Sequence, residues 1–131
     1  MASSPFTSPP NLQAVLDRAL ARVSRQCHSF GHRFPTVGEG ARYQLTENDN
    51  WLAAFWPGML WLAYAATGDP GLCDQAAALL PSFAMRLRRA VHITHDLGFL
   101  YTLSARAQWQ LTGDSAAQEL ALRAATALLK R

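Results

Sequence analysis

Apolar residues recur every three or four positions over residues 12–27, which predicts an amphipathic helix near the start of the chain. Asn11 is a suitable N-cap for this helix, and Gly31 is expected to end it. Residues 34–40 contain one proline and two glycines, so we expect a loop there. No segment shows the alternating apolar and polar pattern of a strand, and we therefore predict an all-α fold.

Four further apolar segments predict the remaining helices. The second helix is apolar nearly all round, which is typical of a buried helix that others surround. Pro57 fits this helix only in its first turn or at a kink, and the third helix is expected to break or bend near Pro81. We place these four helices at residues 52–66, 71–90, 94–111 and 115–131.

The turns that end two of these helices repeat along the sequence. Thr-Gly-Asp occurs at 67–69 and again at 112–114, forty-five residues later, each time between an aromatic-rich and an alanine-rich helix. Helix pairs that recur at such a period indicate an array or toroid of αα-hairpins, in which neighbours cover each repeat. The apolar stripe of the last helix has no following partner and no C-cap glycine, so we expect a truncated chain.

The composition excludes several classes of protein. The chain has 131 residues, of which 50% are hydrophobic and 16% are charged, and this is enough for one domain with a core. Its net charge of +3 comes from scattered basic residues and not from the basic tract of a nucleic-acid-binding protein. Cys27 and Cys73 have no CxxC or metal-ligand spacing, which argues against a disulfide scaffold and against a zinc module.

Two segments bear on where the protein acts. Residues 1–10 form a Ser/Pro-rich leader that we predict to be disordered, and they lack the charge and the apolar stretch of a secretory signal. Residues 51–66 carry no charge, but they are too short for a membrane span and Pro57-Gly58 interrupts them. We therefore expect a soluble, cytoplasmic protein that binds neither membranes nor nucleic acids.

Asp96 and Trp51 are the strongest candidates for chemistry. Asp96 stands at the start of a predicted helix, so its carboxylate fits either an N-cap or a catalytic group tuned by partial desolvation. Trp51 follows the polar run 47–50, which could place its ring at the mouth of a cleft, where it would suit the apolar face of a sugar. Asn48 and Asp49 could then supply hydrogen bonds to the same ligand.

Two other groups carry weaker signals. His92, His95 and Asp96 have the spacing to share a helical face and bind a metal, but no further strong ligand follows. The segment before Thr94 also reads as a loop, so we predict no metal site. The basic turn 86–89, together with His92, could attract an acidic substrate. Cations at a helix C-terminus are, however, usually solvated and favoured by the helix dipole.

Several segments match the motifs of one known family in the right order. They are FGHRFP (30–35), NW (50–51), FWPGMLWLAY (55–64), TGD (67–69), HDLGFLY (95–101) and SARAQW (104–109). Together they resemble glycoside hydrolase family 88, the unsaturated glucuronyl hydrolases, from about Leu12 onward. The resemblance implies that residues 11–131 form the N-terminal portion of an (α/α)6 toroid, with about five of its twelve helices present.

The same resemblance implies an activity and a substrate. The family acts on the 4,5-unsaturated uronic acid at the non-reducing end of lyase-generated oligosaccharides. It hydrates the enol-ether double bond, and the resulting hemiketal collapses to release the partner sugar, with no metal or organic cofactor. The partner of this chain would thus be an unsaturated uronyl oligosaccharide. The sequence does not indicate an oligomeric state.

The family motifs also assign roles to single residues. Asp96, in the His-Asp-Leu-Gly-Phe motif, corresponds to the assisting carboxylate. Trp51 corresponds to a tryptophan that lines the substrate cleft, and His95 flanks the catalytic position. The second aspartate, the general acid/base, lies outside this sequence, and Asp114 cannot replace it because it falls in a turn, so we expect the chain alone to be inactive. The alternative is a non-catalytic helical-hairpin module that binds a protein or an acidic sugar.

Overall fold

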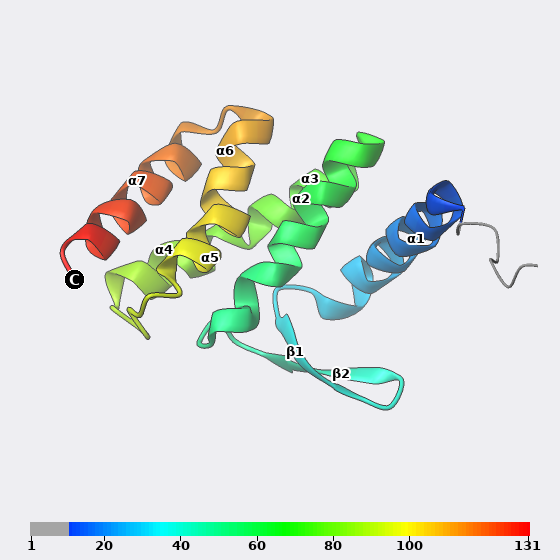
Figure 1. The fold of residues 1–131 in the computed structure, drawn as a ribbon, viewed down its shortest axis with the longest axis horizontal. Coiled ribbons are helices and arrows are strands. Elements are labelled where there is room, and N and C mark those ends of the chain that lie inside the picture. Colours follow the sequence, from blue (N-terminus) through cyan, green and yellow to red (C-terminus); the bar gives the residue numbers. More distant parts are fainter. Residues whose placement is uncertain (1–10) are drawn as a thin grey trace, which may run out of the picture.

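A computed structural model describes residues 11–131 as an array of helices with one β-hairpin (Figure 1). The helices are α1 (Leu12–Phe30), α2 (Phe55–Thr67), α3 (Pro70–Ala78), α4 (Leu80–Arg88), α5 (Leu97–Tyr101), α6 (Ala107–Thr112) and α7 (Ser115–Leu129). A 3₁₀ turn, Trp51–Ala54, precedes α2, and a π-helical turn, Thr102–Arg106, joins α5 to α6. The disordered leader predicted at 1–10 lies outside the described residues.

Most of the predicted helix boundaries are confirmed. α1 begins after Asn11, whose side chain accepts a hydrogen bond from the Ala14 N–H at 3.2 Å, and it ends at Gly31, which has a positive φ. The break expected near Pro81 separates α3 from α4, with the proline at the start of α4. Pro57 likewise lies in the first turn of α2, where a backbone N–H has no partner within the helix.

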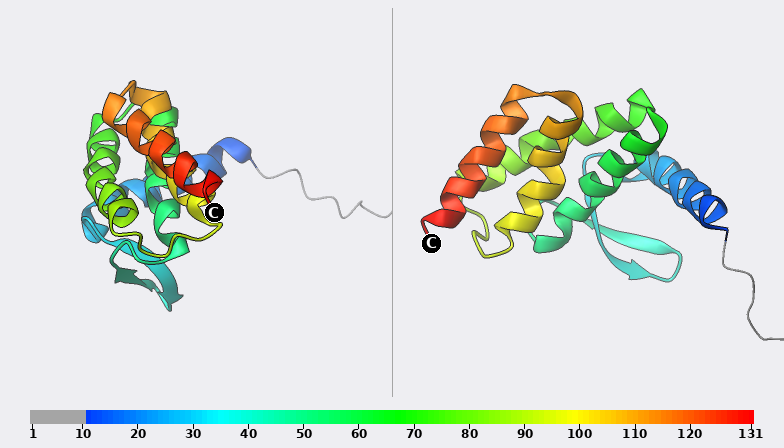
Figure 2. Two further views of the ribbon diagram at one scale, coloured as in Figure 1. Left: turned by 90° about the vertical axis from the view of Figure 1, so that its left-hand side faces the viewer. Right: turned by 45° about the horizontal axis from the view of Figure 1, so that its top comes forward.

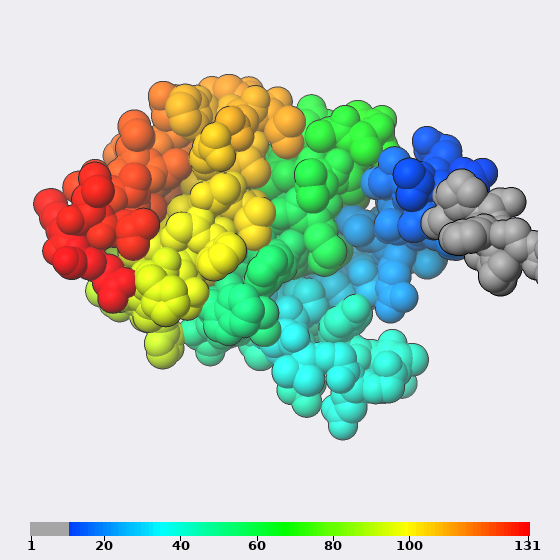
Figure 3. Space-filling model, viewed as in Figure 1, coloured from blue at the N-terminus to red at the C-terminus, as the bar shows by residue number. Residues whose placement is uncertain are grey.

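The prediction that the chain contains no strand is wrong. β1 (Phe34–Glu39) and β2 (Arg42–Thr46) form an antiparallel hairpin that projects from one end of the helical array (Figures 2 and 3). Pro35 and Gly38, which favoured a loop, flank an irregularity in the strand register and therefore disturb few ladder hydrogen bonds. Gly40, with a φ of +59°, supplies the tight turn between the strands.

The two Thr-Gly-Asp turns have the same structure, which agrees with the predicted repeat. In each turn the glycine is left-handed and its N–H bonds to a carbonyl four residues earlier, at 2.7 Å for Gly68 and 2.8 Å for Gly113. Asp69 and Asp114 then cap the next helix, each accepting the N–H two residues ahead, at 2.9 and 2.8 Å. The joints α2–α3 and α6–α7 are therefore two copies of one hairpin connection.

The π turn interrupts the fourth predicted helix, and the apolar pattern does not reveal it. Within the turn, the Ser104 hydroxyl donates to the Leu100 carbonyl at 2.5 Å. Leu103 packs against α2 at Gly58, where a Cβ would lie 3.2 Å from the Cβ of Leu103. The π turn and α2 therefore approach about as closely as a glycine allows. Turns of this kind are frequent near functional sites.

The core lies where α2, α4 and α5 meet the start of the hairpin. Phe83 is fully buried and contacts Phe34 and Tyr101 edge to face, with ring centroids 5.7 and 6.0 Å apart. The Tyr101 hydroxyl donates to the Phe83 carbonyl at 2.8 Å. Burial raises the pKa of Tyr101 to about 12, although the neighbouring cation of Arg86 acts in the opposite direction.

One face of α2 is exposed, contrary to the expectation of a helix surrounded on all sides. The exposed side chains follow one another every three or four residues, and Leu62 is 72% exposed. Together with Trp51 of the preceding 3₁₀ turn, these side chains form what we call the α2 stripe, namely Trp51, Phe55, Met59 and Leu62. The opposite face carries Trp56 and Trp61, both fully buried. Among the described residues, no helix is long and apolar enough to cross a membrane.

Candidate active site

Asp96 lies in the turn before α5. The start of α5 is at the end of the array that also carries the hairpin (Figure 1). Its side chain is 22% exposed, and one carboxylate oxygen accepts a hydrogen bond from the Thr94 hydroxyl at 3.1 Å. The other oxygen lies 3.5 Å from Nε2 of His95, an imidazole that is 86% exposed. The structure thus brings the predicted pair into contact, with the carboxylate partly shielded from water.

The Asp96 side chain does not cap α5. It accepts no backbone N–H at the helix start, although the Asp96 carbonyl accepts the Leu100 N–H at 3.0 Å. Asp114, by contrast, accepts two N–H groups of α7, and its carboxylate also accepts the Gln108 amide at 2.7 Å. The structure therefore does not support the helix cap, one of the two interpretations of the Asp96 carboxylate.

An open hollow of about 490 Å³ is lined in part by His95, the residue that contacts Asp96. Its lining comes from the residue before α5, from α5 and from the π turn, namely His95, Gly98, Phe99, Thr102 and Leu103. Phe99 is 53% exposed, and a Cβ at Gly98 would meet no atom within 4 Å, so the backbone of α5 is open to a ligand here. The hollow offers an apolar wall, a hydroxyl and an imidazole next to a carboxylate.

Trp51 opens the 3₁₀ turn that packs against α5. Its ring is 49% exposed and meets Phe55 edge to face, with ring centroids 5.9 Å apart. Asn50 fixes the start of this turn, because its side-chain oxygen accepts the Leu52 N–H at 2.9 Å. Trp51 is therefore an exposed aromatic on the element next to α5, and its ring contact is with Phe55.

Arg86 is the residue of this region that the sequence pattern misassigns. A solvated basic turn is expected at 86–89, but Arg86 is only 2% exposed. Its Nη1 donates to Oδ1 of Asn48 at 2.9 Å and to the Asn50 carbonyl at 2.7 Å. Its Nε donates to the Val91 carbonyl at 3.3 Å. The guanidinium therefore makes three hydrogen bonds within the protein and is not part of a solvated surface.

The buried cation of Arg86 interacts with both segments that carry candidate site residues, the loop before Trp51 and the turn before α5. Burial lowers the pKa of the guanidinium, while Tyr101, Asp49 and Asp96 act in the opposite direction. Asp49 belongs to the polar run before the 3₁₀ turn, whereas Asp96 precedes α5, so one buried cation lies within electrostatic range of both. Its position three residues after the buried Phe83, on the apolar face of α4, is the signal that could have identified Arg86.

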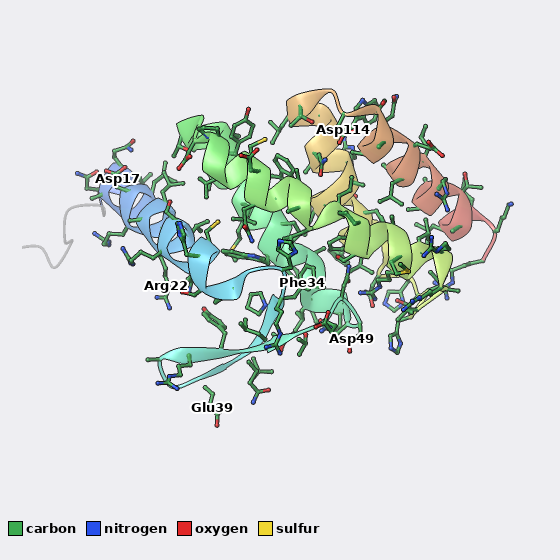
Figure 4. All side chains as sticks on the ribbon, turned by 180° about the vertical axis from the view of Figure 1, so that it is seen from behind. Asp17, Arg22, Phe34, Glu39, Asp49 and Asp114 are labelled. Carbon is green, nitrogen blue, oxygen red and sulfur yellow. The ribbon has the colours of Figure 1, made fainter. Side chains whose placement is uncertain are left out.

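The candidate residues gather at one end of the molecule, and the Thr-Gly-Asp turns lie at the other. Figure 4 shows Asp49 near the root of the hairpin and Asp114 at the opposite end, at the α6–α7 connection. Asp114 is thus engaged in a turn, far from the candidate site. In the part of the chain that the structure describes, no three His, Cys, Asp or Glu side chains come close enough to hold a metal ion. His92, His95 and Asp96 form no such group.

The arrangement of helices is that of part of an α/α toroid, the fold of solved glycoside hydrolases that superpose on this chain. The unsaturated glucuronyl hydrolase from Bacillus sp. GL1 superposes with a TM-score of 0.86 and 43% identity, over 91% of this chain and 32% of that one. A variant of the Streptococcus agalactiae enzyme superposes with a TM-score of 0.87 and 32% identity, over 98% of this chain and 35% of that one.

The sequence relatives lead to the same group. The unsaturated glucuronyl hydrolase of Bacillus sp. (strain GL1) is 43% identical over 121 residues, which are 91% of this chain and 32% of that protein. The unsaturated chondroitin disaccharide hydrolase of Streptococcus pyogenes serotype M1 is 39% identical over 128 residues, or 96% and 32%. The chain is thus homologous to part of the unsaturated glucuronyl hydrolases, glycoside hydrolase family 88, and spans about a third of the curated relatives it matches. No protein-family model matches it.

Proposed function

We propose that this chain supplies part of the active site of a hydrolase that removes 4,5-unsaturated uronic acids from lyase-generated oligosaccharides. The observation that carries the proposal is the state of Asp96, a partly buried carboxylate that no helix start uses and that lies against His95, a residue that lines an open hollow. The homology supports the substrate class, and a variant of the Streptococcus agalactiae relative has been solved in complex with dGlcA-GalNAc6S.

In this proposal Asp96 assists the hydration of the double bond between C4 and C5 of the uronic acid. Water adds across the bond, with the proton on C4 and the hydroxyl on C5. The hemiketal then opens to a ketone and releases the partner sugar. Thr94 orients the carboxylate, His95 flanks it, and Trp51 offers its exposed ring to the apolar face of a sugar. The scheme requires no metal or organic cofactor.

The proposal includes the inactivity of this chain by itself. Proton delivery and activation of water belong to the second aspartate, the general acid/base, which the family resemblance places outside this sequence, so Asp96 would lack its catalytic partner. The test is to incubate the 131-residue chain with an unsaturated uronyl disaccharide and to follow the ultraviolet absorbance of the double bond. We expect no loss above the uncatalysed rate. Clear turnover that Asp96→Asn abolishes would overturn the inactivity of the chain.

A hybrid enzyme tests the catalytic part of the proposal. Residues 11–131 would replace the matching third of the Bacillus sp. relative, and the hybrid is expected to act on the same disaccharide. Asp96→Asn should lower kcat by at least about 100-fold, the size expected for loss of a group that assists proton transfer. Asp74→Asn, at an exposed position of α3, is the matched control and should leave kcat unchanged. A hybrid that folds and stays fully active with Asp96→Asn would contradict the proposal.

A further inference from the structure

We propose that Arg86 is a positioning residue that fixes both loops of the candidate site, the loop that leads to Trp51 and the turn that leads to Asp96. Its relevance to catalysis rests on the proposed function. The contacts that support it, however, lie within this chain and involve no ligand, so the geometry can be tested separately from the activity.

Arg86 binds the first loop at one backbone carbonyl and at one side chain of that loop. The Nη1 group donates to Oδ1 of Asn48 at 2.9 Å and to the Asn50 carbonyl at 2.7 Å. Asn48 in turn donates from Nδ2 to the Ser82 hydroxyl at 3.0 Å, so α4 contacts this loop at two points. Because Asn50 caps the 3₁₀ turn that begins at Trp51, a displacement of Asn50 would move the Trp51 ring.

Arg86 holds the second loop at its most strained point. Ala90 and His92 have φ values of 54° and 49°, a left-handed conformation that residues other than glycine rarely adopt. Val91 lies between them, and its N–H donates to the Arg86 carbonyl at 3.1 Å. The Val91 carbonyl accepts from Nε of Arg86 at 3.3 Å. Arg86 therefore bonds both backbone polar groups of the residue between the two strained positions.

Arg86 acts through the loops and not on a ligand. It is 2% exposed, so an acidic sugar cannot reach its guanidinium, which argues against Arg86 as the cation of an acidic-substrate site. Its hydrogen-bond partners are amide and carbonyl oxygens. In the described part of the chain the one ion-pair distance is that between His95 and Asp96. A buried cation with neutral partners in two loops fits an anchor better than a simple salt bridge.

The shape of the guanidinium explains why an arginine suits this position. Its Nε and Nη1 groups point to different loops while they remain in one rigid plane. A lysine would place one ammonium on a flexible stem and could not keep both sets of bonds. Arg86→Lys therefore removes the bridge between the loops but keeps the positive charge. The variant separates the contribution of the hydrogen bonds from that of the charge.

Hydrogen exchange of backbone amides in the 131-residue chain tests the inference without any ligand. The Leu52 and Leu97 amides report on the two loops, and the Gly68 and Gly113 amides report on the Thr-Gly-Asp turns at the far end. In Arg86→Met we expect exchange at Leu52 and Leu97 to be about 10- to 100-fold faster, the change expected from loss of a charged hydrogen bond. Exchange at Gly68 and Gly113 should not change.

Arg88→Met is the matched control, because it removes the same charge from an exposed position on α4 and should alter none of these amides. Equal acceleration at near and far amides would mean that Arg86 only stabilises the fold, and acceleration in one loop alone would mean that it is no shared anchor. Either result overturns the inference. If Arg86→Met does not fold, Arg86→Lys provides the same comparison.

The hybrid enzyme connects the anchor to catalysis. There Arg86→Lys should lower kcat more than it raises KM, because the anchor keeps the catalytic carboxylate in place. A hybrid with no activity, in a chain that still shows the two-loop exchange pattern, would count against the proposed function and leave the anchor supported. An active hybrid with unchanged kinetics in Arg86→Lys would overturn its role in catalysis.

Discussion

Asp69 and Asp114 cap the helices that follow them, whereas the side chain of Asp96 does not cap α5. Asp69 accepts one backbone N–H of the helix that follows it, and Asp114 accepts two. Asp96 precedes α5 in the same way, yet its carboxylate turns to the Thr94 hydroxyl and to His95. A carboxylate that contributes little to its helix is free for binding or catalysis.

Alanine substitutions at Asp96 and Asp114 should therefore differ in their effect on stability. Asp114→Ala removes a cap and a charged hydrogen bond to Gln108, and should lower the free energy of unfolding by about 2 kcal/mol. Asp96→Ala should cost only about 0.5 kcal/mol, because no backbone N–H loses its partner. Urea denaturation of the two variants measures the difference. Equal losses would mean that Asp96 is mainly a structural residue.

The stability of the chain should depend on Tyr101 at high pH. Burial raises the pKa of this phenol to about 12, so the folded state holds the proton more tightly than the unfolded state does. Both states are protonated below about pH 10, and above it the unfolded state loses the proton first. The free energy of unfolding should then fall by about 2 to 3 kcal/mol up to about pH 12.

Tyr101→Phe provides the comparison for this pH effect. It removes the hydrogen bond to the Phe83 carbonyl, which should cost about 1 kcal/mol near neutral pH. It also removes the titrating group, so the variant should lose much less stability than the natural chain between about pH 10 and 12. Urea midpoints at a series of pH values measure both. Parallel curves for the two proteins would assign the alkaline loss to other groups.

Local motifs identify Asp96, His95 and Trp51 as candidates, because each stands in a short, distinctive run of residues. Arg86 is not found in this way, because its hydrogen-bond partners lie in two loops that only the fold brings to α4. Asn48 and Asn50 precede it by 38 and 36 residues, and Val91 follows it by 5 residues. The basic turn that contains it has the composition of a solvated helix end. Only the packing of α4 shows that one of its arginines faces inward.

At the scale of elements, the helices could be predicted because their apolar spacing and their end signals agree. The hairpin could not, since Pro35 and Gly38 oppose a strand and the register irregularity that accommodates them is a tertiary feature. The π turn is invisible for a similar reason. It depends on the close approach of Leu103 to Gly58, which no periodicity within one helix records.

Replacement by alanine should change the stability in opposite directions at Gly58 of α2 and at Gly98 of α5. At Gly58 the added Cβ would lie 3.2 Å from the Leu103 Cβ, which the π turn holds in place, so overpacking should outweigh the gain in helix propensity. We expect a loss of about 1 kcal/mol. At Gly98 there is open space, and alanine should add about 0.5 to 1 kcal/mol. Thermal unfolding shows whether each substitution raises or lowers the stability. If both Gly58→Ala and Gly98→Ala raise it, α2 and the π turn separate readily to make room for the added Cβ.

At the scale of the whole molecule, the helices form an array whose outer faces are only partly covered. The α2 stripe is exposed along its length, and Leu12 of α1 and Leu129 of α7 are 76% and 87% exposed. Each hairpin in such an array depends on its neighbours to bury its apolar face. The exposed apolar surface is consequently spread over several elements and is not confined to the candidate site.

This surface should make the isolated chain associate as its concentration rises. Leu62→Lys, at the most exposed position of the α2 stripe, should reduce association and leave the unfolding midpoint nearly unchanged, since leucine and lysine have similar helix propensities. Gln110→Lys adds the same charge at an exposed polar position of α6 and should have little effect. Light scattering over a concentration series measures this. A monomer with sharp, concentration-independent melting would instead favour a self-sufficient binding module.

The uncapped carboxylate before α5 also has an evolutionary consequence. Selection for folding alone would retain Asp69 and Asp114, whose loss exposes helix ends, but it would act only weakly on position 96. In a lineage that no longer needed the chemistry, mutations at this position would accumulate without harm to the fold. The rate of substitution at Asp96, compared with the rates at the two capping aspartates among close relatives, thus records whether catalysis is still under selection.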